Sequence, residues 1–214
     1  ITVTDQPKNP GFLKLAESLD RHGWDWMRVP CEWKGFGTKV LSVYNACPDL
    51  LQKGYTHVLH TDAHDTYFLQ SPFNMPPVKE NIPLISTEKA CWPDAHRASE
   101  YPDYYRGDML ANPVWRFVNS GQYLFPIKLF MEVVDAMPIF PQDDDQRWLT
   151  SVYLAKRWPI QLDYTCAVFQ SIAFEAPVDF VTRGGRLKNR ITNTYPIAVH
   201  GNGKTNMEWV YDLK

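Results

Sequence analysis

Two carboxylates three residues apart, Asp62 and Asp65, directly follow an apolar run at residues 55–59 that has the composition of a β-strand. In an open α/β sheet, ligands bind at the carboxyl ends of the strands, so acids at this position lie where chemistry usually occurs. Carboxylate oxygens are hard ligands that suit Mg²⁺ or Mn²⁺, and such an ion commonly bridges a protein to a diphosphate. Two acids can also simply cap a turn and the helix that follows it. This pattern alone leaves both interpretations open.

A second acidic run, DDDQ at residues 143–146, predicts the start of a helix that continues to about Lys156. In this prediction Asp143 is the N-cap and Gln146 occupies position N3, which is a capping box, and the acids complement the helix dipole. Capping explains Asp143 but does not require three consecutive aspartates. We therefore expect one or two of them to face a site.

A third polar cluster begins at His200, which follows an apolar strand predicted at residues 197–199. A lone histidine after a strand is commonly a satisfied polar group, but the glycine-rich turn at residues 201–203 lets the backbone approach an anion closely. Earlier in the chain, a glycine-containing loop at residues 30–37 leads into a helix that carries Lys39 in its first turn. This loop lacks the P-loop pattern and is only weak evidence for phosphate binding.

The elements that must position these groups are predicted from periodicity and caps. Residues 1–4 form a strand, Asn9 and Pro10 open a helix that Gly23 ends, and residues 26–29 form a second strand. This β-α-β opening predicts a parallel sheet with a nucleotide-type crevice. Further strands are predicted at residues 83–87 (ending at Glu88), 123–125, 160–162 and 167–169, with a helix at 127–136. Residues 89–116 are irregular and aromatic, which is typical of a lid or binding loop.

Composition narrows the class of protein. The chain has 214 residues, of which 44% are hydrophobic and 21% charged, so a single domain with a sizeable core is expected. A net charge of −2 provides no global field for nucleic acid. No apolar run approaches the roughly 20 residues that cross a bilayer, so we expect no membrane span. The four cysteines lack CxxC spacing, which argues against a zinc knuckle.

Ten short motifs occur in the same order as in one known family. They are EWKG (32–35), TKV (38–40), DAHD (62–65), CWPD (91–94), YP (101–102), NSG (119–121), DDDQ (143–146), LD (162–163), FQ (169–170) and HGNG (200–203). With them the chain resembles the glycosyltransferase domain of the procollagen lysyl hydroxylases. The resemblance implies an α/β fold of GT-A type, Rossmann-like, whose central mixed, mostly parallel sheet is flanked by helices. It also implies one domain at 1–214, with a nucleotide-binding half at 1–88 and an acceptor and catalytic half at 89–214.

The resemblance also assigns a reaction and a site. It implies transfer of a hexose from a UDP-sugar, UDP-glucose or UDP-galactose, to a hydroxyl on a protein or glycan. The implied ligands of Mn²⁺, with Mg²⁺ as the alternative ion, are Asp62, Asp65 and His200, and an imidazole among carboxylates favours Mn²⁺. The implied nucleotide-binding residues are Thr4, Trp33, Lys39, Thr61, His64, Gly201, Gly203 and Lys204. The implied catalytic residues are Trp92, Asn119, Asp144 and Asp145.

The chain departs from the family at several points. His64 stands where the family usually has a tyrosine between its metal aspartates, the segment between Trp92 and Asn119 is longer, and Lys204 directly follows Gly203. The sequence includes no hydroxylase domain, so we expect either an excised domain or, in preference, a stand-alone bacterial or viral relative. The expected location is the cytoplasm of a bacterial or virus-infected cell rather than the secretory lumen.

Three alternatives have different chemistry. The Arg183–Arg190 basic cluster allows a hydroxymethylated base of viral DNA as acceptor, although a solvated face explains it as well. A non-catalytic carbohydrate-binding module explains the eight tryptophans but neither the paired aspartates nor the DDDQ run. A metal-dependent hydrolase built on the set His57, His60, Asp62, His64 and Asp65 is disfavoured, because His57 and His60, three apart on a strand, point to opposite sides.

Overall fold

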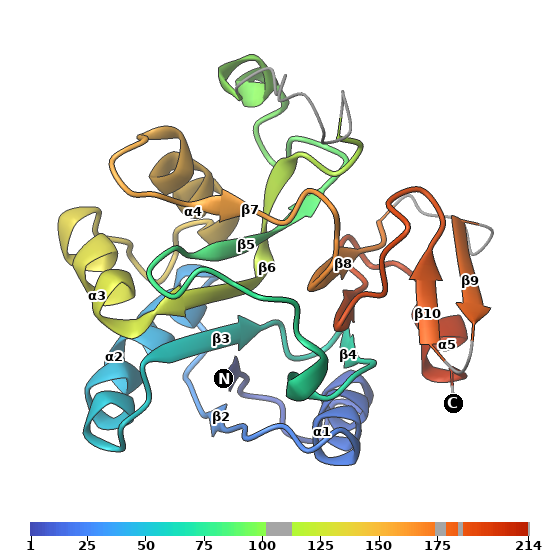
Figure 1. Cartoon of the computed structure of the whole chain (residues 1–214). Coiled ribbons are helices and arrows are strands. Elements are labelled where there is room, and N and C mark those ends of the chain that lie inside the picture. Colours follow the sequence, from blue (N-terminus) through green and yellow to red (C-terminus); the bar gives the residue numbers. More distant parts are fainter. Residues whose placement is uncertain (102–112, 174–178, 184–185, 214) are drawn as a thin grey trace.

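A six-stranded sheet forms the centre of the structure (Figure 1), a computed structural model that describes residues 1–101, 113–173, 179–183 and 186–213. The strand order is β2-β1-β3-β6-β5-β7. Five strands run in one direction and β6 is antiparallel to both of its neighbours, β3 and β5. The prediction of a mixed, mostly parallel sheet is confirmed. The strands are β1 (Thr2–Val3), β2 (Arg28–Val29), β3 (His57–Thr61), β5 (Leu84–Glu88), β6 (Phe117–Pro126) and β7 (Gln161–Leu162).

A smaller sheet extends from the end of β3. It has the order β4-β11-β8, with β4 at Thr66–Phe68, β8 at Phe169–Ser171 and β11 at Ala198–His200. Strand β11 is antiparallel to β4, and the pairing sets His200 opposite Thr66. Because β4 begins one residue after Asp65, this register brings His200 to the loop that carries both acids. Strands β9 (Phe180–Arg183) and β10 (Arg186–Asn189) form a separate antiparallel pair.

Helices cover both faces of the central sheet. Helices α2 (Gly37–Gln52), α3 (Ile127–Ala136) and α4 (Asp145–Leu154) pack on one face, where Val43, Phe130 and Leu149 contact the core around Val58 and Phe125. Helix α1 (Pro10–Arg21) packs on the other face, where Leu15 and Leu19 join a cluster with Leu84 and Leu124. The alternation of side chains along the strands separates the two clusters. A short helix, α5 (Glu208–Tyr211), and two 3₁₀ helices, η1 (Pro72–Asn74) and η2 (Ala95–Glu100), complete the described elements.

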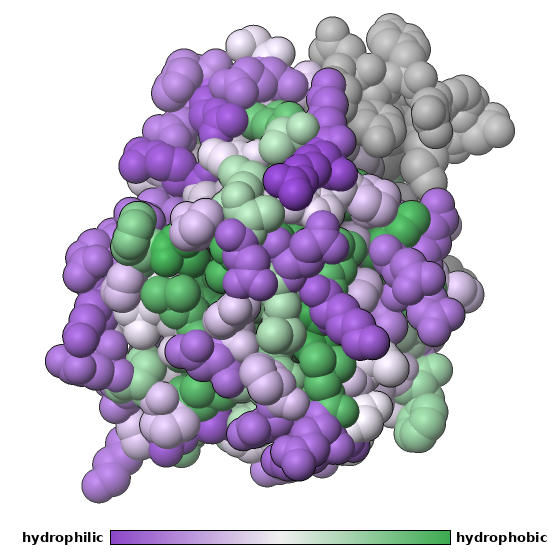
Figure 2. Space-filling view, turned by 90° about the vertical axis from the view of Figure 1, so that its left-hand side faces the viewer, coloured by the Kyte–Doolittle hydropathy of each residue, from purple (hydrophilic) through white to green (hydrophobic). Residues whose placement is uncertain are grey.

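The outer surface of the helical layer is mixed in polarity. Figure 2 views the protein from the side of α2 and α3, where hydrophilic side chains cover much of the surface and apolar ones lie between them. Within the described part of the chain, no helix combines the length and apolar character that crossing a bilayer requires.

Several predicted elements are confirmed and others shift. Helix α1 has Asn9 as its N-cap with Pro10 at its first position, and α3 has the predicted bounds. Strand β6 is longer than the predicted residues 123–125, because the polar NSG motif continues the strand and is buried. Part of the predicted loop at 89–116 forms η2, and residues 102–112 of it lie outside the described residues.

Candidate active site

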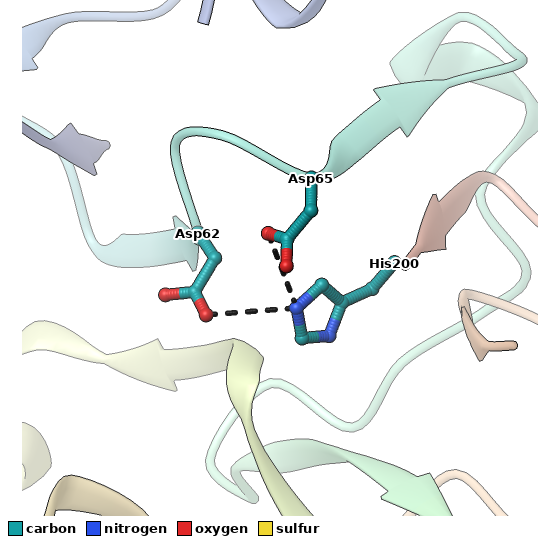
Figure 3. A group of neighbouring side chains, drawn as sticks. All are labelled: Asp62, Asp65 and His200. Atoms are coloured by element: carbon teal, nitrogen blue, oxygen red, sulfur yellow. Dashed lines mark ion pairs between the residues drawn. The ribbon is translucent and has the colours of Figure 1, made fainter. Parts of the chain in front are cut away.

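Three side chains from two sheets converge on one point (Figure 3). Asp62 follows β3, Asp65 precedes β4, and His200 ends β11. The Nε2 atom of His200 lies 3.5 Å from Asp62 Oδ2 and 3.4 Å from Asp65 Oδ1. The three ligand atoms all lie within 4.8 Å of one another. Ligands at about 2.1 Å from an octahedral ion stand ~3 Å apart when adjacent, so the group is spaced for one divalent cation.

The His200 ring is oriented for metal binding. Its Nδ1 lies 3.0 Å from Asn119 Oδ1, and that oxygen also accepts a hydrogen bond from the Gly121 amide. Asn119 Oδ1 is therefore an acceptor, and His200 Nδ1 must carry the proton. Nε2 is buried and has no hydrogen-bond partner among the described residues, although it faces two carboxylates. An orphaned ring nitrogen beside two acids, with the other nitrogen fixed by an outer partner, fits a metal ligand.

Electrostatics show how strongly the acids act on this ring. Burial opposes protonation of His200, but Asp65 and Asp62 outweigh it and raise the pKa of the ring to about 10. Burial likewise opposes ionisation of Asp62, but Lys39 and His200 hold the pKa of its carboxyl well below its usual range. The Asp62 carboxylate therefore remains charged and attracts a cation at this point.

Gly121 has no side chain, and the His200 ring occupies the space that a side chain at this position would fill. A Cβ atom added there would lie 2.0 Å from Cε1 of the His200 ring. Gly121→Ala is therefore expected to displace the imidazole and to weaken Mn²⁺ binding at least about tenfold, which isothermal titration calorimetry measures.

A second glycine provides the control for Gly121→Ala. Gly23 has a φ of 70°, and a Cβ there meets no described atom within 4 Å. Gly23→Ala should therefore cost about 1 kcal/mol of stability through backbone strain and leave Mn²⁺ affinity unchanged. Wild-type affinity in Gly121→Ala would show that His200 does not bind the ion.

Lys39 connects Asp62 to helix α4. Its Nζ lies 2.6 Å from Asp62 Oδ1 and 2.8 Å from Asp145 Oδ2, and the Lys39 and Asp145 side chains are buried. Burial disfavours the ammonium, but Asp145 and Asp62 outweigh it and raise the pKa of Lys39 above its usual value. Lys39 thus lies at the cluster of Asp62, Asp65 and His200, and both of its ion pairs are made to protein carboxylates; its predicted contact with a phosphate stays a prediction.

The start of α4 differs by one residue from the prediction. Asp144 is the N-cap and accepts a hydrogen bond from the Arg147 amide at 2.7 Å. Asp143 instead accepts from the Phe140 amide, so the assignment of Asp143 as N-cap with Gln146 at N3 is wrong. The shift turns Asp145 and Gln146 inward, where both are buried. The expectation that some of the aspartates face a site is met by Asp144 and Asp145, which both line a cavity.

Asp144 can be tested as a cap separately from any role in the reaction. Asp144→Ala should lower the free energy of unfolding by about 1 kcal/mol, whereas Asp144→Asn should change it little because asparagine also caps. Urea denaturation measures both. If Asp144→Ala were as stable as wild type, Asp144 would not be the cap. If Asp144→Asn kept wild-type stability but lost activity, the carboxylate would act on the substrate.

Two neighbouring cavities meet at the three converging side chains. The first, of about 280 Å³, is lined by residues that include Thr4, Trp33 and His64. The second, of about 570 Å³, is lined by residues that include Trp92 and Asn119. Four residues line both cavities: Phe36, Lys39, Asp62 and Asp65. Asp62 and Asp65 therefore lie at the junction of the two cavities.

Most predicted site residues lie in these cavities. Thr4, Trp33 and His64 line the first, and Trp92, Asn119, Asp144, Asp145, Gly203 and Lys204 line the second.

Two predicted nucleotide-binding residues are placed differently. Thr61 faces a separate, largely apolar cavity of about 400 Å³ under α1, since strand residues alternate between the faces of the sheet. The Gly201 amide donates to the Asp65 carbonyl at 2.7 Å, so it is not available to a phosphate, contrary to the prediction for this amide.

Three site residues were not predicted. Phe36 lines both cavities, and Glu88 and Asn202 lie on the floor of the second. Glu88 was detectable in principle, because it is an acid at the carboxyl end of a buried strand, as Asp62 is. Phe36 carries no such signal, and Asn202 was covered only as part of the glycine-rich turn at residues 201–203, not through its side chain.

Comparisons with known proteins found related sequences and a similar fold. The family model described as the PLOD GT domain matches residues 21–211. The multifunctional procollagen lysine hydroxylase and glycosyltransferase LH3 of Rattus norvegicus is 28% identical over 166 residues, which cover 72% of this chain and 21% of LH3. The uncharacterised protein R699 of Acanthamoeba polyphaga mimivirus is 31% identical over 124 residues, covering 58% of this chain and 25% of R699. The chain thus matches about a fifth to a quarter of the length of these relatives.

A solved structure has a similar fold. It is that of a glycosyltransferase involved in the glycosylation of the major capsid of PBCV-1, with a TM-score of 0.51, 13% sequence identity, and coverage of 94% of this chain and 91% of that one. At this identity the likeness extends to the fold alone.

Proposed function

This chain belongs to the PLOD GT domain family, and on that premise we propose that it is an Mn²⁺-dependent glycosyltransferase that moves a hexose from a UDP-sugar to a hydroxyl group. Its fold is of the GT-A type. The observation that carries the proposal is the convergence of Asp62, Asp65 and His200 at the junction of two cavities. A nucleotide-sugar has the matching form, with a base and a sugar joined by a diphosphate.

The first cavity suits the nucleoside. Trp33 is partly exposed and packs edge-to-face on Phe36, with ring centroids 5.7 Å apart, so an aromatic wall is available to a planar base. Thr4 Oγ1 and His64 Nε2 lie 2.9 Å apart, within hydrogen-bond distance, and both residues line the same cavity. All of these residues lie within residues 1–88, the half of the chain that the family resemblance predicts to bind the nucleotide.

The junction suits the diphosphate. A divalent ion bound by Asp62, Asp65 and His200 would supply positive charge that stabilises the departing diphosphate. Gly203, with a φ of 69°, and Lys204 line the second cavity and are the proposed backbone and cationic groups for the phosphate oxygens.

The second cavity suits the sugar and the acceptor. Trp92 is 67% exposed at its rim and offers an indole face for stacking on a sugar. The loop that carries Trp92 is tied to α4 by a two-bond ion pair between Asp94 and Arg147 and by Gln146, which donates to the Trp92 carbonyl. Asp145, Asp144 and Asn119 surround the same space, where a carboxylate can hold sugar hydroxyls or accept the acceptor's proton.

We propose UDP-glucose or UDP-galactose as the donor and a protein or glycan hydroxyl as the acceptor. The name of LH3 supports a hydroxylated lysine on a collagen-like chain, whereas the hydroxymethylated base of viral DNA is supported only by the basic residues of β9 and β10. The proposed location is the cytoplasm of a bacterial or virus-infected cell, and the mimivirus relative supports the viral origin.

A donor panel tests the proposed function. The protein is incubated with UDP- and GDP-sugars, with Mn²⁺ or with EDTA, and release of the free nucleotide is measured. Slow Mn²⁺-dependent hydrolysis of one UDP-hexose is expected without acceptor, and faster release with hydroxylysine peptides or glycans. Absence of UDP release and of UDP binding, combined with binding of free glycans, would support the carbohydrate-binding module instead.

A further inference from the structure

Glu88, at the end of β5, lies at the centre of a buried polar network. Its side chain accepts hydrogen bonds from three amide groups: Gln146 Nε2 at 2.5 Å, Asn202 Nδ2 at 2.8 Å and Asn119 Nδ2 at 3.3 Å. These residues belong to three different elements, namely α4, the turn after β11, and β6. Glu88 is only 6% exposed, so the network is shielded from water.

Backbone amides fix the orientation of all three side-chain amides. The amide of Gly121 donates to Asn119 Oδ1, that of Ser120 to Gln146 Oε1 and that of Ala173 to Asn202 Oδ1. A backbone N–H can only donate, so each side-chain oxygen is already assigned and each NH₂ group must point toward Glu88. Gln146 and Asn119 donate to Oε1 of Glu88 and Asn202 donates to Oε2, so the side chain at position 88 must accept hydrogen bonds at both of its terminal atoms. This requirement selects a carboxyl group over a glutamine. The three donated hydrogen bonds favour its ionised form, whereas burial outweighs them and raises the pKa of Glu88.

Each amide also connects Glu88 to a group of the proposed site. Asn119 Oδ1 holds Nδ1 of His200, and Gln146 follows Asp145 in the first turn of α4. Asn202 lies between Gly201 and Gly203 in the turn after His200. Outer partners of this kind orient metal-binding histidines and are costly to remove.

We propose that Glu88 is a positioning residue that sets the orientation of His200 and the placement of Asp145 and the 201–203 turn, and so sets the affinity for the metal ion and the diphosphate. The inference rests on the proposed function, since the ion and the nucleotide come from it. In this proposal Glu88 acts through Asn119, Gln146 and Asn202.

The test is Glu88→Gln, which keeps the shape and replaces one acceptor with a donor. In calorimetric titrations, Mn²⁺ affinity in the presence of UDP is expected to fall about tenfold, and transfer is expected to slow. The control is Asp163→Asn. Asp163 is also buried and accepts from the amides of Val168 and Phe169, but it does not line the cavities. Asp163→Asn should lower the melting temperature and leave Mn²⁺ affinity unchanged.

Glu88→Asp covers the case in which Glu88→Gln does not fold. The shorter carboxylate keeps the charge but withdraws from at least one donor, so a smaller loss of Mn²⁺ affinity is expected. If the Glu88 variants that fold melt at lower temperature but bind Mn²⁺ and UDP as wild type does, Glu88 only stabilises the fold and the inference is wrong. A wild-type protein that binds neither Mn²⁺ nor UDP would instead overturn the proposed function itself.

Discussion

Asp65→Ala is expected to lower the rate of sugar transfer by about 10³-fold or more while leaving the fold intact. The substitution removes one of the three proposed protein ligands, and a catalytic metal ion supplies several kcal/mol of charge stabilisation, at about 1.4 kcal/mol per tenfold in rate. The Asp65 side chain is 36% exposed and close to another acid, so its loss should not destabilise the protein. Transfer is measured by UDP release, and folding by the thermal melting curve.

The control for Asp65→Ala is Asp49→Ala. Asp49 is an exposed acid on α2 outside the site, so this variant should transfer sugar as wild type does. If Asp65→Ala transferred sugar at the wild-type rate with Mn²⁺, the ligand assignment would be wrong.

Lys39→Met is expected to have the largest effect on stability. The ammonium is buried between Asp62 and Asp145, and removal of one partner from a buried ion pair typically costs about 3–5 kcal/mol because it leaves an uncompensated charge. Urea denaturation measures the loss. Added Mn²⁺ should stabilise Lys39→Met more than wild type, because a bound ion neutralises the charge that Lys39 leaves on Asp62.

A double variant tests whether the loss in Lys39→Met comes from the unpaired acids. Lys39→Met combined with Asp145→Asn removes both a cation and a carboxylate, so it should be more stable than Lys39→Met alone. If the two single losses simply add, Lys39 and Asp145 do not interact as the structure shows.

Local signals in the sequence predict the elements whose ends are set by local chemistry. Asn9 and Pro10 start α1 as expected, since a polar cap and a proline at the first position act within one turn. Strand β3 is displaced by two residues from the predicted 55–59, because pairing with β6 as far as Gln122 continues it through His60 and Thr61. That pairing joins residues far apart in the sequence, which no local pattern shows.

The convergence of the three proposed metal ligands was predictable from the sequence, but their supporting contacts were not. The position of Asp62 and Asp65 after a strand is a local signal, and family likeness added His200. The ion pairs of Lys39 join residues 23 and 106 positions away in the sequence, and its residue type alone suggested a phosphate partner. The assignment of the cap to Asp143 failed because DDD offers three equivalent caps, and only the hydrogen bond from Phe140 shows that Asp143 faces elsewhere.

The central claim is that a metal ion at Asp62, Asp65 and His200 joins the protein to a nucleotide diphosphate. Calorimetric titration of UDP into the protein, once with Mn²⁺ and once with EDTA, tests it most directly. We predict binding with Mn²⁺, a large loss of affinity with EDTA, and the same loss in Asp65→Ala with Mn²⁺ present. Equal UDP affinity with Mn²⁺ and with EDTA would contradict the claim.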